Sequence, residues 1–138
     1  MYTISKEYHF CAAHRLEGHV KCGRLHGHNY KVIVTVQTND LIDGMVIDYH
    51  DLDDIVNPKV DGMDHKYLVS RENYAANCPY AMVAAKAGHA YQLPQNKSTA
   101  EYIAEHLYKM LIQSLHPEAF KVTVEVQETP KVTAVYTA

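Results

Sequence analysis

The sequence predicts an α+β fold, in which elements in the order β-β-α-α-β-β form an antiparallel sheet with helices on one face. Apolar and polar residues alternate near both ends of the chain, as in half-buried strands. Between those ends, apolar residues recur at three- and four-residue steps, as in helices. The length of 138 residues is that of one domain, so we expect residues 1–138 to share a single core.

Two strands are predicted in the first part of the chain. The apolar residues of the first strand share even positions: Ile4, Tyr8, Phe10 and Ala12. The second strand, residues 30–38, repeats this pattern with Tyr30, Val32, Val34 and Val36. The connection from about residue 15 to residue 25 is too long for a tight hairpin turn, and connections of that length are often functional.

Two helices are predicted after these strands. Asp48 can cap a short helix that ends before Pro58. The second helix is expected to begin at a capping box formed by Ser98 and Glu101 and to end before Pro117. Its apolar residues follow at helical steps: Ile103, Leu107, Met110, Leu111 and Leu115.

The last two strands are expected over residues 120–126 and 132–136, with a turn at Thr129 and Pro130 between them. Between residues 65 and 96, only the Ala-rich stretch 80–87 has a helical pattern, of one or two turns. Helices on one face would leave the other face and the sheet edges open. We therefore expect the chain to form an oligomer.

The composition argues against several classes of function. The formal net charge is −3, with both signs mixed along the chain, so no basic stripe is available for nucleic acid. No apolar run has the length of a signal peptide or of a membrane span. Cys11, Cys22 and Cys78 are widely spaced and odd in number, unlike a secreted disulfide framework. We expect a cytoplasmic protein with reduced thiols.

Three of the ten histidines share the parity of the predicted buried face. His14 continues the even positions of the first strand, and His26 and His28 precede the second strand on even positions. Antiparallel pairing would bring these strand ends together, so the three imidazoles would converge at one end of the sheet. Three imidazoles with a fourth position open are typical of catalytic zinc sites, and we predict bound Zn²⁺ there.

Cys22 lies in the stretch K-C-G-R-L-H-G-H-N-Y, close to two of these histidines. It could be a fourth zinc ligand, which would close the open position. It could instead be a small buried residue. A third interpretation is a general base or nucleophile, because nearby zinc and Lys21 or Arg24 would favour the thiolate. The spacing alone leaves these three interpretations open.

Carboxylates at two further places suggest a site. Asp64 and His65 form an acid–imidazole pair, although sequence neighbours on a strand point apart. Glu128 extends the apolar parity of residues 120–126, and a buried carboxylate needs partners. A ligand with a ring N–H and an exocyclic amine would supply a bidentate pair. The alternative for Glu128 is a strand-end residue turned to solvent.

Four motifs together resemble a known family. F-C-A-A-H-R-L, C-G-R-L-H-G-H-N-Y, M-D-H-K-Y-L and V-Q-E-T are similar in order and spacing to the 6-pyruvoyltetrahydropterin and 6-carboxytetrahydropterin synthase family. The resemblance covers nearly the whole chain. It implies the tunnelling fold, in which trimers close a barrel and two trimers stack into a homohexamer, with active sites between subunits.

The resemblance also implies residue roles in catalysis. The three histidines would bind zinc, and Cys22 would be the catalytic base rather than a ligand. Asp64 and His65 would form its partner dyad and exchange protons on the opposite side of the substrate. Because sites in the family lie between subunits, these residues need not all meet within one chain.

Other residues would bind the substrate. The resemblance implies that Glu128, with Thr129, holds the 2-amino and N3 edge of a pterin ring. Thr99 is a further candidate beside the pterin pocket. Lys21 and Arg24 are candidates for a triphosphate group. The family often reads N-P-T-x-E where residues 96–101 read N-K-S-T-A-E, and the segment 71–97 is longer than the resemblance leads us to expect.

The spacing C-x-x-x-H-G-H is similar to the carboxy-forming bacterial members, which act in queuosine biosynthesis. Pyruvoyl-forming members carry two more residues there, and a third subgroup has a glutamate near the cysteine, from which Glu17 is too distant. The resemblance implies a lyase that converts 7,8-dihydroneopterin triphosphate into 6-carboxytetrahydropterin, acetaldehyde and triphosphate. The alternatives are pyruvoyl-forming activity and a non-catalytic zinc or pterin-binding protein in which Cys22 closes the metal site.

Overall fold

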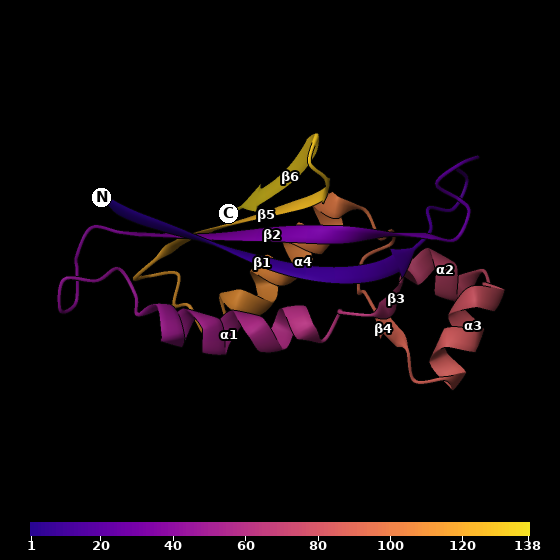
Figure 1. Cartoon of the computed structure of the whole chain (residues 1–138), viewed down its shortest axis with the longest axis horizontal. Helices are drawn as coiled ribbons and strands as arrows, with labels where there is room; N and C mark the ends of the chain where they lie inside the picture. The colour runs from indigo at the N-terminus through magenta and orange to yellow at the C-terminus, as the bar shows by residue number, and fades with distance from the viewer.

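The computed structural model describes residues 1–138, apart from the side chain of Ala75. The strands are β1 (Tyr2–His14), β2 (His26–Thr38), β3 (Lys66–Val69), β4 (Ala90–Gln92), β5 (Lys121–Thr129) and β6 (Val132–Thr137). The helices are α1 (Tyr49–Asp61), α2 (Arg71–Ala75), α3 (Pro79–Lys86) and α4 (Ala100–Leu111). The six strands form one sheet in the order β4-β3-β1-β2-β5-β6 (Figure 1).

The sheet is mixed rather than wholly antiparallel. β1, β2, β5 and β6 pair antiparallel, which confirms the four predicted strands and the predicted pairing of the first two. β3 pairs parallel with β1, and β4 pairs parallel with β3. These two short strands were not predicted, because runs of three and four residues are too short to show a clear period.

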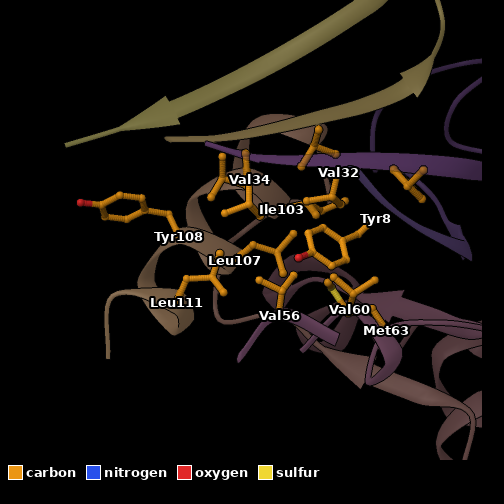
Figure 2. Packing of buried hydrophobic residues seen from close by; sticks show 14 of the residues in the cluster. Tyr8, Val32, Val34, Val56, Val60, Met63, Ile103, Leu107, Tyr108 and Leu111 are labelled. Carbon is orange, nitrogen blue, oxygen red and sulfur yellow. The ribbon is translucent and has the colours of Figure 1, made fainter. Parts of the chain in front are cut away.

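The main core lies between the even-parity face of the sheet and the helices α1 and α4. Tyr30, Val32, Val34 and Val36 are fully buried on β2, as the alternation predicts. Figure 2 shows valines of β2 packed against Ile103, Leu107 and Leu111 of α4 and Val56 and Val60 of α1. Burying each such side chain contributes roughly 1.5–3 kcal/mol, so this layer holds the long strands in register.

A second, smaller core lies on the opposite face, at the β3–β4 end. Tyr67 and Val69 of β3 pack with Cys78 and Ala81 and with Ala13, which has odd parity on β1. α3 therefore covers the opposite face from α1 and α4, and the expectation of helices on one face is wrong. The predicted helical stretch at 80–87 is confirmed as α3, and Figure 1 shows it beside β3 and β4.

Helix boundaries differ from the predictions in two places. Asp48 caps α1 as expected, accepting from the backbone N–H of His50, but the helix continues through Pro58 to Asp61. Proline removes one helical hydrogen bond, and the burial of Val56 and Val60 on either side outweighs that loss. At α4 the cap is Thr99 rather than Ser98.

The C-terminal end of α4 also differs from the prediction. The helix ends at Leu111, earlier than expected, and a turn carries the chain to the buried Leu115. No helix in the described chain combines the length and apolarity needed to span a membrane.

One histidine of α4 makes the stability of the fold depend on pH. Burial lowers the pKa of His106, and the charge of Lys109 lowers it further. His106 Nε2 is hydrogen-bonded to the Tyr91 hydroxyl at 2.7 Å. The unfolded chain therefore takes up a proton at higher pH than the folded chain. The stabilisation is complete above the unfolded pKa of about 6.5 and is lost as the pH falls through the lowered folded pKa.

We expect His106→Gln to weaken this pH dependence, because glutamine still accepts from Tyr91 but does not titrate. The urea unfolding free energy of the variant should fall less than that of the wild type between about pH 7 and pH 5. The exposed Gln113 does not titrate and gives a control, since Gln113→Ala should leave the wild-type slope unchanged. Equal slopes for His106→Gln and the wild type would contradict the assignment.

Candidate functional site

The predicted convergence of three histidines is present at one end of the sheet. The β1–β2 register places His14 opposite His26 and Ala12 opposite His28. One ligand atom from each of the three imidazoles lies within 4.8 Å of the other two. The ring centroids of His14 lie 4.6 Å from His26 and 5.0 Å from His28. The strand pairing alone therefore assembles a three-imidazole cluster from residues on both sides of a loop.

Two of these imidazoles are oriented by backbone carbonyls. His14 Nδ1 lies 2.8 Å from the carbonyl oxygen of Ser98, and His26 Nδ1 lies 2.7 Å from that of Arg24. A carbonyl can only accept, so each Nδ1 carries the proton and each Nε2 keeps its lone pair. Metal-binding histidines are typically oriented in this way by a second hydrogen bond.

The protonation state of His14 also suits a metal. Its side chain is 1% exposed, and burial lowers its pKa to about 4, so it is neutral at physiological pH. Its Nε2 is buried without a hydrogen-bond partner in the described chain. Because neutral imidazole is the form that binds metals, the cluster fits a zinc ion with three nitrogen ligands.

Glu128 faces the histidine cluster rather than bulk solvent. Its carboxylate oxygens lie 3.9 Å from His14 Nε2 and 3.8 Å from His28 Nε2, too far for hydrogen bonds. Burial raises the pKa of Glu128, and the nearby carboxylate of Glu101 raises it further. The β5–β6 register shifts between Val126 and Thr129, where Glu128 leaves the regular ladder. A half-buried acceptor therefore lies beside the Nε2 atoms of His14 and His28.

The loop that carries Cys22 is held by its own backbone. Leu16 N–H donates to the carbonyl of Cys22 at 2.7 Å, and Arg15 Nε donates to that of Gly23 at 2.7 Å. The carbonyl of the next residue is the one that orients His26. A Cβ on Gly23 would lie 2.1 Å from the carbonyl oxygen of His19, so this turn requires glycine.

The Cys22 side chain is exposed and lies outside the cluster of three ligands. This position does not fit the interpretation of Cys22 as a small buried residue. Lys21 and Arg24 flank the thiol, are exposed, and form no ion pair within the described residues. The same loop therefore presents one thiol and two free cations.

Asp64 and His65 form the expected pair, but not on a strand. His65 has a φ of 57°, in the left-handed region, and its Nδ1 lies 2.8 Å from Asp64 Oδ2. Cys11 N–H donates to the other carboxylate oxygen at 2.8 Å. These two hydrogen bonds lower the pKa of Asp64, the one from Cys11 most. The turn before β3 thus makes sequence neighbours face each other.

The dyad lines a cavity to which the thiol does not contribute. His65 lines an open cavity of about 520 Å³ with Cys11, Asn29 and His28 of the histidine cluster, and Cys22 is not among the residues around it. The His65 side chain is 80% exposed. One chain therefore brings the three histidines and Glu128 together, but does not bring Cys22 and the dyad into one cavity.

The remaining candidates lie around the cluster. Thr99 caps α4, accepting from Tyr102 N–H at 3.4 Å, directly after the carbonyl that orients His14. Thr129 is exposed at the end of β5. Sequence reasoning missed two residues that matter here, Ser98 and Arg15. Arg15 directly follows a buried histidine, and Ser98 was assigned to the cap that Thr99 provides.

Comparison with known proteins supports the family resemblance. The family model for 6-pyruvoyl tetrahydropterin synthase matches residues 3–138. A 6-carboxy-5,6,7,8-tetrahydropterin synthase of Haemophilus influenzae is 34% identical over 137 residues, covering 94% of each chain. A protein of the same name from Rickettsia bellii is 31% identical, covering 94% of this chain and 96% of the other.

Solved structures share the fold. An uncharacterized protein from Wolinella succinogenes superposes with a TM-score of 0.83 at 24% identity, covering 99% of this chain and 97% of the other. The 6-pyruvoyl tetrahydropterin synthase of Plasmodium falciparum gives a TM-score of 0.77 at 22% identity, with the same coverage. The family model spans nearly all of a chain whose strand pairing assembles this histidine cluster, and the chain belongs to the 6-pyruvoyl tetrahydropterin synthase family.

Proposed function

We propose that this chain is a zinc-dependent lyase acting on 7,8-dihydroneopterin triphosphate. With one water, the reaction gives 6-carboxy-5,6,7,8-tetrahydropterin, acetaldehyde and triphosphate, a step of queuosine biosynthesis. The name of the Haemophilus influenzae relative and the C-x-x-x-H-G-H spacing support the carboxy-forming reaction. The likeness to the Plasmodium falciparum enzyme, which is named for the pyruvoyl-forming reaction, supports the same fold.

The observation that carries the proposal is the combination of oriented imidazoles and a half-buried carboxylate. His14 and His26 keep Nε2 lone pairs because their Nδ1 atoms donate to carbonyls. Glu128 lies within 4 Å of two of the three imidazoles. A zinc ion held by His14, His26 and His28 would supply Lewis-acid polarisation of the substrate's side-chain oxygens. The Glu128 carboxylate would lie close enough to orient the pterin ring that carries this side chain.

Glu128 would bind the pterin ring. An ionised carboxylate accepts from the ring N3–H and the 2-amino group in a bidentate pair, which fixes the orientation of the ring. Burial raises the pKa of Glu128, and these two donors would offset that effect by favouring the charged form. Thr129 follows on the same strand, and Thr99 is at the start of α4, so both are proposed substrate contacts.

Cys22 would act as the general base. As thiolate it would take a proton from a carbon of the substrate side chain, and Lys21 and Arg24 on its loop would hold the triphosphate. Asp64 accepts from His65 Nδ1, which leaves Nε2 of His65 to exchange protons on the other side of the substrate. Because Cys22 does not line the cavity of that dyad in one chain, we propose that a neighbouring subunit supplies the dyad.

The proposed assembly is a homohexamer made of two trimers. β4 and β6 are the end strands of the sheet, and β6 exposes Val132 and Val135. Unpaired strand edges with exposed apolar residues favour pairing with another chain. A non-catalytic zinc or pterin-binding role is less well supported, since Cys22 is outside the ligand cluster that such a role would have it close.

The reaction itself gives the first test. We expect the zinc-loaded protein, incubated with 7,8-dihydroneopterin triphosphate, to release 6-carboxytetrahydropterin and acetaldehyde in equal amounts. Mass spectrometry of the pterin and an enzymatic assay of acetaldehyde measure both products. Pyruvoyltetrahydropterin without acetaldehyde would reassign the reaction to the pyruvoyl-forming type, and no product would favour the non-catalytic alternative.

Replacing the thiol separates catalysis from metal binding. We expect Cys22→Ala to lower kcat by about 10²–10⁴-fold, the usual contribution of a general base. The zinc content should stay near one ion per chain. Elemental analysis measures the zinc, and product formation measures kcat. Val20→Ala, a change at an exposed residue of the same loop, is the matched control and should keep wild-type activity. Loss of zinc from Cys22→Ala would instead make Cys22 a ligand.

The carboxylate can be tested in the same way. Glu128→Gln removes the charge but not the volume, and hydrogen bonds to a charged group contribute about 1.5–3 kcal/mol. We therefore expect the dissociation constant for a pterin such as neopterin to rise roughly 10–100-fold, measured by fluorescence titration. Glu125→Gln, at odd parity on the same strand, should bind like the wild type. Unchanged affinity in Glu128→Gln would exclude the proposed pterin contact.

A further inference from the structure

Arg15 contacts the Cys22 loop and the α2–α3 segment at once. Its Nε donates to the carbonyl of Gly23 at 2.7 Å, next to Cys22 in the chain. Its Nη1 lies 3.5 Å from Cys78 Sγ at the start of α3, and its guanidinium lies 5.9 Å from the ring centroid of Tyr80. A planar guanidinium presents donors in fixed directions, so these contacts fix its position and through it the Gly23 carbonyl.

Glu17 fixes the same guanidinium from another side. Glu17 Oε2 lies 3.3 Å from Arg15 Nη2, and Glu17 Oε1 accepts from Asn73 Nδ2 at 2.8 Å. Asn73 belongs to α2 and is 0% exposed, so its amide is held in place by packing. The carboxylate of Glu17 therefore bridges a buried residue of α2 and the arginine that orients the loop.

The same chain of contacts reaches the histidine cluster. Ser98 Oγ donates to the backbone carbonyl of Arg15 at 3.3 Å, and the carbonyl of Ser98 orients His14. Figure 1 shows α2 and α3 at the end of the sheet where the loop after β1 lies. The start of the Cys22 loop is thus tied to the metal-binding end of β1 and to the α2–α3 segment.

We propose that Arg15, held by Glu17 and Asn73, is a positioning residue that fixes the Cys22 loop for catalysis. These three residues form a clamp, and Asn73 in α2 is its buried end. The inference rests on the proposed role of Cys22 as base. A displacement of about 1 Å in a catalytic group can lower a rate about 10²-fold, so the clamp would act on kcat and not on metal binding.

A hydrogen-bond swap tests the clamp. Asn73→Asp puts two carboxylates together with no donor between them, and should release Glu17 and Arg15. We expect kcat to fall at least about tenfold, with KM within about twofold and zinc content unchanged. Hydrogen–deuterium exchange of peptides covering residues 16–24 should become faster, because the amides of Leu16, Gly23 and Arg24 are bonded within this loop.

Adding Glu17→Gln to Asn73→Asp should restore the clamp. The glutamine amide can donate to Asp at position 73, while its carbonyl oxygen accepts from Arg15. We expect kcat and loop exchange to return toward wild-type values. The control Glu72→Gln combined with Asn73→Asp has the same net charge, but Glu72 binds Lys97 instead, so it should restore neither.

Arg15→Lys covers the case in which Asn73→Asp fails to fold. Arg15 contacts Gly23, Cys78 and Glu17 through three separate nitrogens, and the donors of an ammonium share one nitrogen. Loop exchange should therefore rise and kcat should fall while zinc is retained. Loop exchange needs no substrate, so the clamp is tested even if the wild type does not turn over the pterin. Wild-type exchange or wild-type kcat in the folded variants, or equal rescue by Glu72→Gln, would overturn the proposal.

Discussion

The antiparallel register of β1 and β2 is the constraint on which the site depends. It places His14 opposite His26 and keeps both, with His28, on the parity that the core also uses. A shift of one residue would move every side chain of one strand to the other face. The buried valines of β2 and the apolar residues of β1 therefore stabilise the fold and also position the site, because their packing fixes the side of the sheet on which the three imidazoles lie.

The cluster is also a burden on stability that a metal would relieve. A buried nitrogen that has lost its hydration and has no hydrogen-bond partner lowers the stability of the fold by about 1–3 kcal/mol. His14 Nε2 is such an atom among the described residues. Its Nδ1 cannot turn away, because it donates to the Ser98 carbonyl. The packing that orients His14 for a metal is therefore the same packing that makes its free nitrogen unfavourable, as is common where function requires strain.

Local alternation was sufficient to predict the histidine cluster, since parity and antiparallel pairing carry the three residues to one place. It failed where structure depends on distant contacts. β3 and β4 are short and parallel. Their formation depends on pairing with β1 and on packing against Ala13 and α3, rather than on a pattern in their own sequence. The Asp64–His65 contact requires a left-handed backbone conformation at His65, which cannot be predicted from the sequence because that residue is not glycine. The role of Arg15 could be inferred only from its contacts with the Cys22 loop and with Cys78, which are distant from each other in the sequence.

The position of the dyad supports the proposal that subunits share the site. Asp64 accepts from the backbone N–H of Cys11, so the pair is fixed beside β1, and the cavity that His65 lines includes His28 but not Cys22. A proton relay needs groups within hydrogen-bond reach of the same substrate. Cys22 does not line the cavity that His65 lines, so one chain does not bring the thiol and the dyad together there. An exposed His65 is accessible to a second chain, so assembly would complete the site without any rearrangement of the strands.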